Sequence, residues 1–324
     1  MQNRIHWVDN LRGLCMLAIL FDHTEHYYVG ENIVNLNLYV TDALCLFFMI
    51  SGYLLYKAEG SVCLKHKCGS IVRSLIMPYF IFTTAMSLPK VLAHGGDFAL
   101  KDIALGIVMG QASWFVAALA VAEVGFLVAL RLVRGNQWAL GVVCVVAFVA
   151  SFVLSAATDS CVWQVDNALQ AMLFLFVGYT YHRHEASIKV STGYVAAALL
   201  ALIGIKTYVA MEGITLTIWH INVSNYAVFV ANIAADCLAM FGLFRRLPPC
   251  KALEWTGRHS LVYYFLCGGV PLLLSKMAAR LGFTYVGCYM QVVVVFVAVY
   301  AVASATTWAI YRYAPFVVGK KRGA

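Results

Sequence analysis

The chain has 324 residues, of which 62% are hydrophobic and only 12% are charged, and its mean hydropathy is +0.80. This composition excludes an ordinary soluble globular protein. The net charge of +8 does not require a nucleic-acid partner, because the basic residues are spread over several loops instead of forming one stripe. We therefore expect an all-α, polytopic integral membrane protein in which residues 1–324 form a single transmembrane domain, without a separate soluble domain.

Apolar windows separated by polar breaks predict ten transmembrane helices. Most Lys and Arg residues fall into one set of alternate loops, so the positive-inside rule places both termini in the cytoplasm. No cleavable signal peptide is expected, because the first apolar segment carries Asp, Arg and His. The predicted spans cover about 7–28, 36–56, 71–92, 110–130, 138–157, 163–181, 192–211, 218–243, 258–278 and 286–311.

The first predicted span carries two strongly polar groups, Arg12 and His23, on one helix face. Eleven steps of about 100° return to nearly the same direction, with Met16 and Ile19 in the stripe between them. The same steps cover about 16 Å along the axis, so the two side chains cannot touch. Ionisable groups at membrane depth are costly, and a functional role is the default interpretation.

Later segments give weaker signals. Residues 93–110 predict an external loop or interfacial helix, and the polar span 218–243 suits a cavity better than a lipid-facing helix. Cys63, His66 and Cys68 are a weak metal pattern, and we expect no metal site and no disulfide framework. Further polar candidates within the predicted spans are Glu123, Lys206, His220, Asn222, Asn225, Asn232 and Asp236.

The first predicted span contains Asp9-Asn-Leu-Arg12-Gly13 and then His23, with ten residues between Arg12 and His23. This pattern resembles the opening of the membrane-bound acyltransferase-3 family, whose members begin with Asp-x-Leu-Arg-Gly and a His at the same spacing. A Phe-Phe-x-x-Ser-Gly segment follows, matched by Phe47-Phe48-Met-Ile-Ser51-Gly52.

Later matches extend the resemblance over essentially the whole chain. They are a basic loop ending in Arg73 and Pro78, Trp114-Phe115, Gly178-Tyr179, and Gly257-Arg-His-Ser260-Leu261-Val-Tyr-Tyr264. Many relatives carry a His one turn later, where this chain reads Phe265-Leu266-Cys267, so no role of that His transfers.

The resemblance implies a transferase that moves an acyl group, with acetyl favoured, from acyl-coenzyme A to a hydroxyl group. The implied acceptor is a cell-surface carbohydrate or a lipid-linked glycan precursor, as in polysaccharide O-acetylation. Acetyl-coenzyme A is then the donor substrate, and membrane lipids and the glycan are the partners. The implied location is the bacterial inner (cytoplasmic) membrane, while the oligomeric state remains open.

The resemblance also assigns roles to single residues. His23 would be the catalytic base, since imidazole titrates near neutrality. Arg12 would meet a phosphate, the pantetheine arm or the thioester carbonyl of the donor, although a snorkelling anchor paired with Asp9 is the structural alternative. Arg73 is a candidate for binding donor phosphates. Arg12 and His23 would then lie along one tunnel.

Around these residues we expect a second set with supporting roles. Asp22, Glu25 and His26 crowd the external end of the first span, where one of them could orient an imidazole. Asp9, Ser51 and Trp114 are expected to line the site. For Ser51 the structural alternative is close helix packing, and for Trp114 a place in the aromatic belt.

Two other function classes compete with the acyltransferase. A transporter or flippase of a glycan or lipid-linked precursor would show paired broken helices in two related halves, and the sequence shows no internal repeat. A membrane sensor or scaffold without turnover has less need of ionisable groups deep inside a helix.

Overall fold

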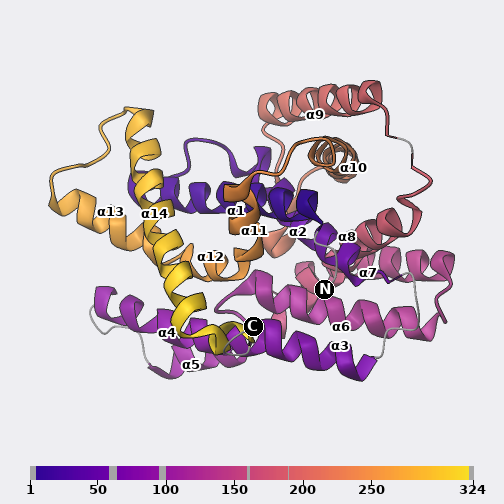
Figure 1. The fold of residues 1–324 in the computed structure, drawn as a ribbon, viewed down its shortest axis with the longest axis horizontal. Helices are drawn as coiled ribbons and strands as arrows, with labels where there is room; N and C mark the ends of the chain where they lie inside the picture. Colours follow the sequence, from indigo (N-terminus) through magenta and orange to yellow (C-terminus); the bar gives the residue numbers. More distant parts are fainter. Residues whose placement is uncertain (1–4, 58–63, 95–99, 159–160, 189, 321–324) are drawn as a thin grey trace. The chain divides into compact units, whose positions relative to one another are not determined.

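The computed structural model describes residues 5–57, 64–94, 100–158, 161–188 and 190–320, and these residues are almost entirely helical (Figure 1). The chain divides into two compact units. The first unit comprises Met1–Phe47, Lys189–Thr217 and Asn222–Ile310, and the second comprises Phe48–Ile188, Ile218–Ile221 and Tyr311–Ala324. The expectation of a single transmembrane domain stays a prediction.

The first unit is organised around α1, which packs against α10, α11, α12 and α13. Helices α9 and α10 lie side by side (Figure 1). A short antiparallel hairpin, which pairs Leu216 with Val223, lies between them in sequence. Its elements are α1 (His6–Val29), η1 (Leu36–Leu38), the first half of α2 (Val40–Leu55), α9 (Thr192–Glu212), β1 (Leu216–Thr217), β2 (Asn222–Val223), α10 (Tyr226–Phe244), α11 (Lys251–Arg258), α12 (Ser260–Leu266), α13 (Val270–Arg280) and most of α14 (Tyr289–Tyr313).

The second unit is organised around α8, which packs against both α6 and α7. The boundary between the units falls inside α2, after Phe47. The elements of this unit, besides the second half of α2, are α3 (Leu64–Ile71), η2 (Val72–Ile76), α4 (Met77–His94), α5 (Leu100–Val108), α6 (Trp114–Leu132), α7 (Gln137–Ala157), η3 (Val162–Gln164), α8 (Val165–His184), η4 (Trp219–Ile221) and η5 (Pro315–Val318).

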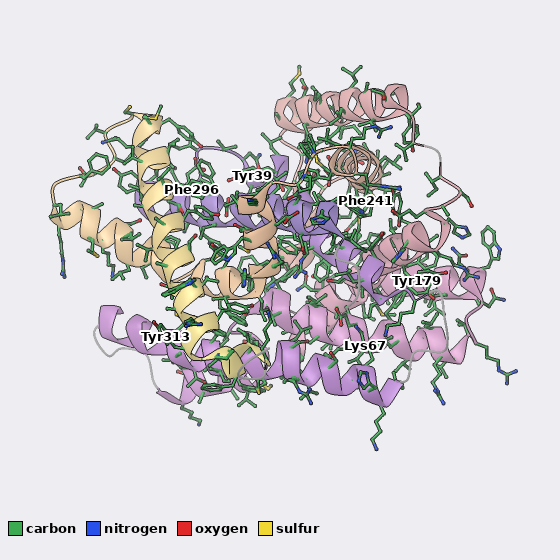
Figure 2. All side chains as sticks on the ribbon, in the orientation of Figure 1. Tyr39, Lys67, Tyr179, Phe241, Phe296 and Tyr313 are labelled. Atoms are coloured by element: carbon green, nitrogen blue, oxygen red, sulfur yellow. The ribbon has the colours of Figure 1, made fainter. Side chains whose placement is uncertain are left out.

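Aromatic side chains fill much of each interior. In the first unit the rings of Trp7 and Phe241 lie 5.1 Å apart, as do those of Phe21 and Phe296. In the second unit Tyr179 lies edge-on to Phe126 at 5.5 Å. Figure 2 shows Phe241, Phe296 and Tyr179 among the helices they pack against. Burying such rings removes large apolar areas from solvent or lipid and fixes the helix contacts.

Six helical segments of the described chain are long and apolar enough to cross a membrane, and a seventh arises if α12 and α13, bent by 47°, are one span. The six are Leu64–Ser87, α6, α7, α9, α10 and α14. Helix α2 is shorter at 16 residues, and α1 carries several charged side chains. The helical fold class is confirmed, while ten spans and two cytoplasmic termini stay predictions.

The predicted span 218–243 is wrong in its first part, because α10 begins only at Tyr226. The Asn225 side chain accepts a hydrogen bond from the Val228 amide at 3.1 Å and caps the helix there. His220, Asn222 and Asn225 therefore lie in or beside the hairpin, and all are exposed. A helix does form within residues 93–110, as α5, and its place at the membrane interface stays a prediction. Residues 95–99 lie outside the described chain.

Candidate functional site

Arg12 and His23 both lie in α1, with half-buried side chains. Between them, Met16 and Ile19 are 0% and 3% exposed. The stripe that connects the two polar groups therefore faces the protein interior. The rings of His23 and Tyr27 are stacked, with an interplanar angle of 22° and centroids 6.4 Å apart.

Arg12 meets a residue that lies 248 positions later in the chain. Its guanidinium Nη2 donates a hydrogen bond to Ser260 Oγ at 3.0 Å, and Ser260 is only 3% exposed. Gly13 allows the helices to approach closely enough for this contact. Because glycine has no Cβ, which here would overlap the Leu253 carbonyl, the backbones of α1 and α11 touch directly. The structure thus joins the first and last family-like motifs, and Ser260 had been given no role from the sequence.

Glu25 is fully buried near the far end of α1. Its carboxylate accepts hydrogen bonds from the Val34 amide at 3.1 Å and from the Tyr289 hydroxyl at 2.8 Å. These two bonds tie the segment after α1 and the start of α14 to the helix. The suggested orienting role of Glu25 towards an imidazole stays a prediction.

Asp22 and His26 make similar contacts with the same segment. Asp22 Oδ1 accepts hydrogen bonds from Asn32 Nδ2 at 2.6 Å and from the Tyr39 hydroxyl at 3.3 Å. His26 Nδ1 lies 3.0 Å from Asn32 Oδ1. Both groups therefore help to hold residues 32–39 over the end of α1, and their orienting role also stays a prediction.

Arg73 lies in η2, a π-helical turn between α3 and α4. Such turns are rare and often accompany functional sites. Arg73 lines an open pocket of about 460 Å³ together with Lys65, His66, Gly69 and Ser70. The basic side chains and the Ser70 hydroxyl suit an anionic ligand that carries phosphate groups. Lys65 and His66 were not assigned from the sequence, although their place in a basic loop before Arg73 was a usable signal.

The expected site-lining residues lie on three different helices. Asp9 is half-buried in the first turn of α1, where its carbonyl faces Gly257. Ser51 is half-buried and precedes Gly52, which packs directly on the Leu175 carbonyl. Trp114 is half-buried as the first residue of α6. Gly52 thus serves close helix packing, and the lining role of all three expected residues stays a prediction.

A buried ionic network in the first unit was only partly expected. Lys206 Nζ lies 2.5 Å from Asp42 Oδ2 and donates a hydrogen bond to the Asn37 carbonyl at 3.0 Å. Asn232 Nδ2 donates to Asp42 Oδ1 at 2.7 Å, and Asp236, also on α10, is 3% exposed. The network links α2, α9 and α10, as buried charges require paired and hydrogen-bonded partners. Asp42, at the start of an apolar run, had been overlooked.

Within the described ranges, no group of three or more His, Cys, Asp or Glu side chains could hold a metal ion. Cys63, part of the weak metal pattern, lies outside the described residues. Cys68 and the other eight described cysteines are free.

The fold and these polar sites define a helical membrane protein with ionisable groups inside its bundle. The acyltransferase-3 family model, described as an acyltransferase domain, matches residues 5–312, and the chain belongs to this family. The protein is accordingly a membrane acyltransferase. No curated protein and no solved structure matches the chain.

Proposed function

We propose that the protein transfers an acetyl group from acetyl-coenzyme A to a hydroxyl of a cell-surface carbohydrate or lipid-linked glycan precursor. Membership of the acyltransferase-3 family supports the reaction class. The observation that supports a coenzyme A donor is the basic pocket around Arg73. Membrane lipids and the glycan are the proposed partners, and the proposed location is the bacterial cytoplasmic membrane.

The donor's charge explains the proposed role of the pocket. The nucleotide part of coenzyme A carries several phosphate groups, and guanidinium and ammonium groups bind phosphate oxygens through charge-assisted hydrogen bonds. Arg73, Lys65 and His66 line the same pocket and can share that charge. Because the pocket is open and its basic residues are exposed, the phosphates can remain partly hydrated while the acyl arm is held elsewhere.

The proposed chemistry is a direct transfer that uses His23 as the base. The neutral imidazole takes the proton of the acceptor hydroxyl while the hydroxyl oxygen attacks the thioester carbonyl. A C–O bond forms, the C–S bond breaks, and the protonated imidazole returns the proton to the leaving sulfur. The products are an acetyl ester and free coenzyme A. No metal is required in this scheme.

Arg12 is proposed to stabilise negative charge on the donor, either at a phosphate or at the thioester oxygen. The hydrogen bond from Arg12 to Ser260 holds the guanidinium in one orientation. Because the guanidinium is already held in place, it needs less reorganisation when negative charge develops on the donor. We propose orienting roles for Asp22, Glu25 and His26, and lining roles for Asp9, Ser51 and Trp114.

The proposal is tested with the purified full chain in liposomes, supplied with labelled acetyl-coenzyme A and candidate glycans. We expect release of free coenzyme A and label on the glycan. Arg73→Gln should raise the KM for acetyl-coenzyme A about tenfold, because a charged hydrogen bond is lost. With acetyl-pantetheine, which lacks the nucleotide, the same variant should show no defect.

The matched control is Arg131→Gln, which removes an exposed arginine from the end of α6 in the same unit. Its KM should equal that of the native protein. If the native protein and His23→Ala released coenzyme A at the same background rate while a glycan crossed the liposome wall, a transporter would replace the acyltransferase.

A further inference from the structure

Unpaired buried polar atoms gather at one place in the second unit. In the described chain, eight buried side-chain oxygen or nitrogen atoms have no hydrogen-bond partner. Four of them belong to Ser113, Asp166, Asn167 and Gln170, whose exposures are 9%, 3%, 2% and 2%. Buried polar groups are normally satisfied, so four orphaned atoms in two short segments point to an occupant that completes their bonding.

The helical period brings three of these side chains onto one face of α8. Relative to Asp166, Gln170 is rotated by about 40° and Asn167 by about 100°. Asn167 Nδ2 donates a hydrogen bond to Gln164 Oε1 at 2.9 Å, which adds a further buried amide to the group. We name Ser113, Gln164, Asp166, Asn167 and Gln170 the η3 polar cluster.

The segment that carries Ser113 is held against η3. The Trp163 amide donates to the Met109 carbonyl at 2.7 Å. A Cβ at Gly110 would lie 2.6 Å from Trp163 Cα, so only glycine permits this approach. Helix α6, which begins directly after Ser113, packs against both η3 and α8. The sequence-distant halves of the η3 polar cluster therefore meet at one corner of this unit.

Aromatic rings border the same corner. The Trp163 ring is half-buried and lies 5.4 Å from the ring of Tyr79 and 6.0 Å from that of Phe80. Trp163 and Gln164 both have φ of 55°, a left-handed conformation that large side chains rarely adopt. The backbone is thus held in a strained form that fixes where the Trp163 ring lies.

We propose that the η3 polar cluster and Trp163 bind a pyranose ring of the acceptor carbohydrate. The inference rests on the proposed function and names the part of the chain that recognises the acceptor. Side-chain amides both donate to and accept from sugar hydroxyls, a carboxylate accepts from them, and an indole face packs against the apolar C–H face of a pyranose. A phosphate ligand is disfavoured here, because Asp166 would repel it.

The test uses the full chain in lipid nanodiscs free of glycoside detergents, which would compete for such a site. The probes are methyl α-glucopyranoside, methyl β-galactopyranoside and methyl N-acetyl-β-glucosaminide. Their binding is measured by calorimetry and by saturation-transfer NMR. We expect at least one probe to bind, and Asp166→Asn and Gln170→Met each to weaken that binding about tenfold.

Gln170→Met also separates recognition from a structural role. It removes an unpaired buried polar group and keeps much of the side-chain volume, so its Tm should equal or exceed that of the native protein. Thr180→Val is the matched control, because Thr180 Oγ1 is another unpartnered buried atom on α8. This control should bind the probe like the native protein.

Several results would overturn the inference. One is that none of the three probes binds the native protein. Another is that Asp166→Asn and Gln170→Met both bind the probe as tightly as Thr180→Val does. That result would leave ordered water as the occupant of the cluster. Failure of the proposed function looks different. In that case a probe binds and depends on Asp166 and Gln170, yet no coenzyme A is released with any glycan.

Discussion

Each unit contains one helix crossing in which two glycines allow direct backbone contact. In the first unit, Gly13 of α1 faces a carbonyl of α11 and Gly257 of α11 faces a carbonyl of α1. In the second unit, Gly52 of α2 and Gly178 of α8 do the same. Within a membrane such crossings gain energy from close van der Waals packing, because lipid tails provide no hydrophobic drive between helices.

The two crossings position different side chains. Beside the first lies the hydrogen bond from Arg12 to Ser260. Beside the second, the rings of Tyr53 and His182 stack at 3.9 Å, the Tyr53 hydroxyl donates to Glu185 at 2.6 Å, and His182 Nδ1 donates to the Tyr53 carbonyl at 2.7 Å. Close glycine packing therefore positions a candidate catalytic group, Arg12, in one unit and the stacked rings of Tyr53 and His182 in the other. Loss of a side chain held beside the first crossing should affect the chemistry, and loss of one held beside the second should affect stability.

The largest contrast is expected between two histidines. His23→Ala should lower kcat about 100-fold or more, because the proton acceptor is lost, while the unfolding temperature changes little. His182→Ala should lower the unfolding temperature and leave kcat within a few-fold. Steady-state coenzyme A release and thermal unfolding measure both effects.

His184→Ala is the control for the first variant, because His184 is an exposed histidine at the end of α8 with no proposed role in the reaction. Equal activity losses for His23→Ala and His184→Ala would contradict the role of His23 as the base.

The glycine crossings should resist even one added methyl group. Gly257→Ala and Gly178→Ala each place a Cβ onto a backbone carbonyl that cannot move aside. We expect each to lower the free energy of unfolding by about 3 kcal/mol, as in overpacked cores. Thermal unfolding of the purified protein tests this.

Gly204→Ala provides the comparison, since a Cβ at this position in α9 meets nothing within 4 Å. It should leave stability unchanged or raise it by about 0.5 kcal/mol through helix propensity. A crossing variant as stable as Gly204→Ala would show that the helices separate without cost.

Two hydroxyl deletions sharpen the contrast between the crossings. Ser260→Ala should lower kcat/KM about tenfold, because Arg12 loses the partner that orients it. Tyr53→Phe should lower the free energy of unfolding by about 1 kcal/mol and spare kcat/KM. Ser275→Ala, which removes an unpartnered buried hydroxyl from α13, should change neither quantity. A reversed pattern would exchange the roles of the two crossings.

The smallest effect is expected at Gly319, near the C-terminus, which packs against Arg73 of the basic pocket. Gly319 has φ of 73°, and a Cβ there would overlap the Arg73 carbonyl. Gly319→Ala should therefore shift Arg73 and raise the KM for acetyl-coenzyme A about threefold, equivalent to under 1 kcal/mol. Gly282→Ala carries the same kind of backbone strain in open space and should leave this KM unchanged. An equal rise in both variants would assign the effect to strain alone.

The sequence by itself determined the helical membrane class, the family and the placement of Arg12 and His23 on one helix. These properties depend on composition and on the period of consecutive residues, which are local. The same reasoning singled out Arg73, because a basic residue before an apolar span is visible in the sequence, and its role in donor binding stays a prediction. It failed at residues 218–225, where a capping Asn and a hairpin interrupt an apolar stretch.

Only the tertiary structure joined Arg12 to Ser260, Asp42 to Lys206, and Arg73 to Lys65 and His66 in one pocket. Such pairings depend on which helix faces meet, and here close glycine contacts decide part of that. The four orphaned atoms around η3 likewise appear only when burial and every hydrogen-bond partner are known. Helical periodicity acts over one turn, whereas these sites arise from packing between segments far apart in the chain.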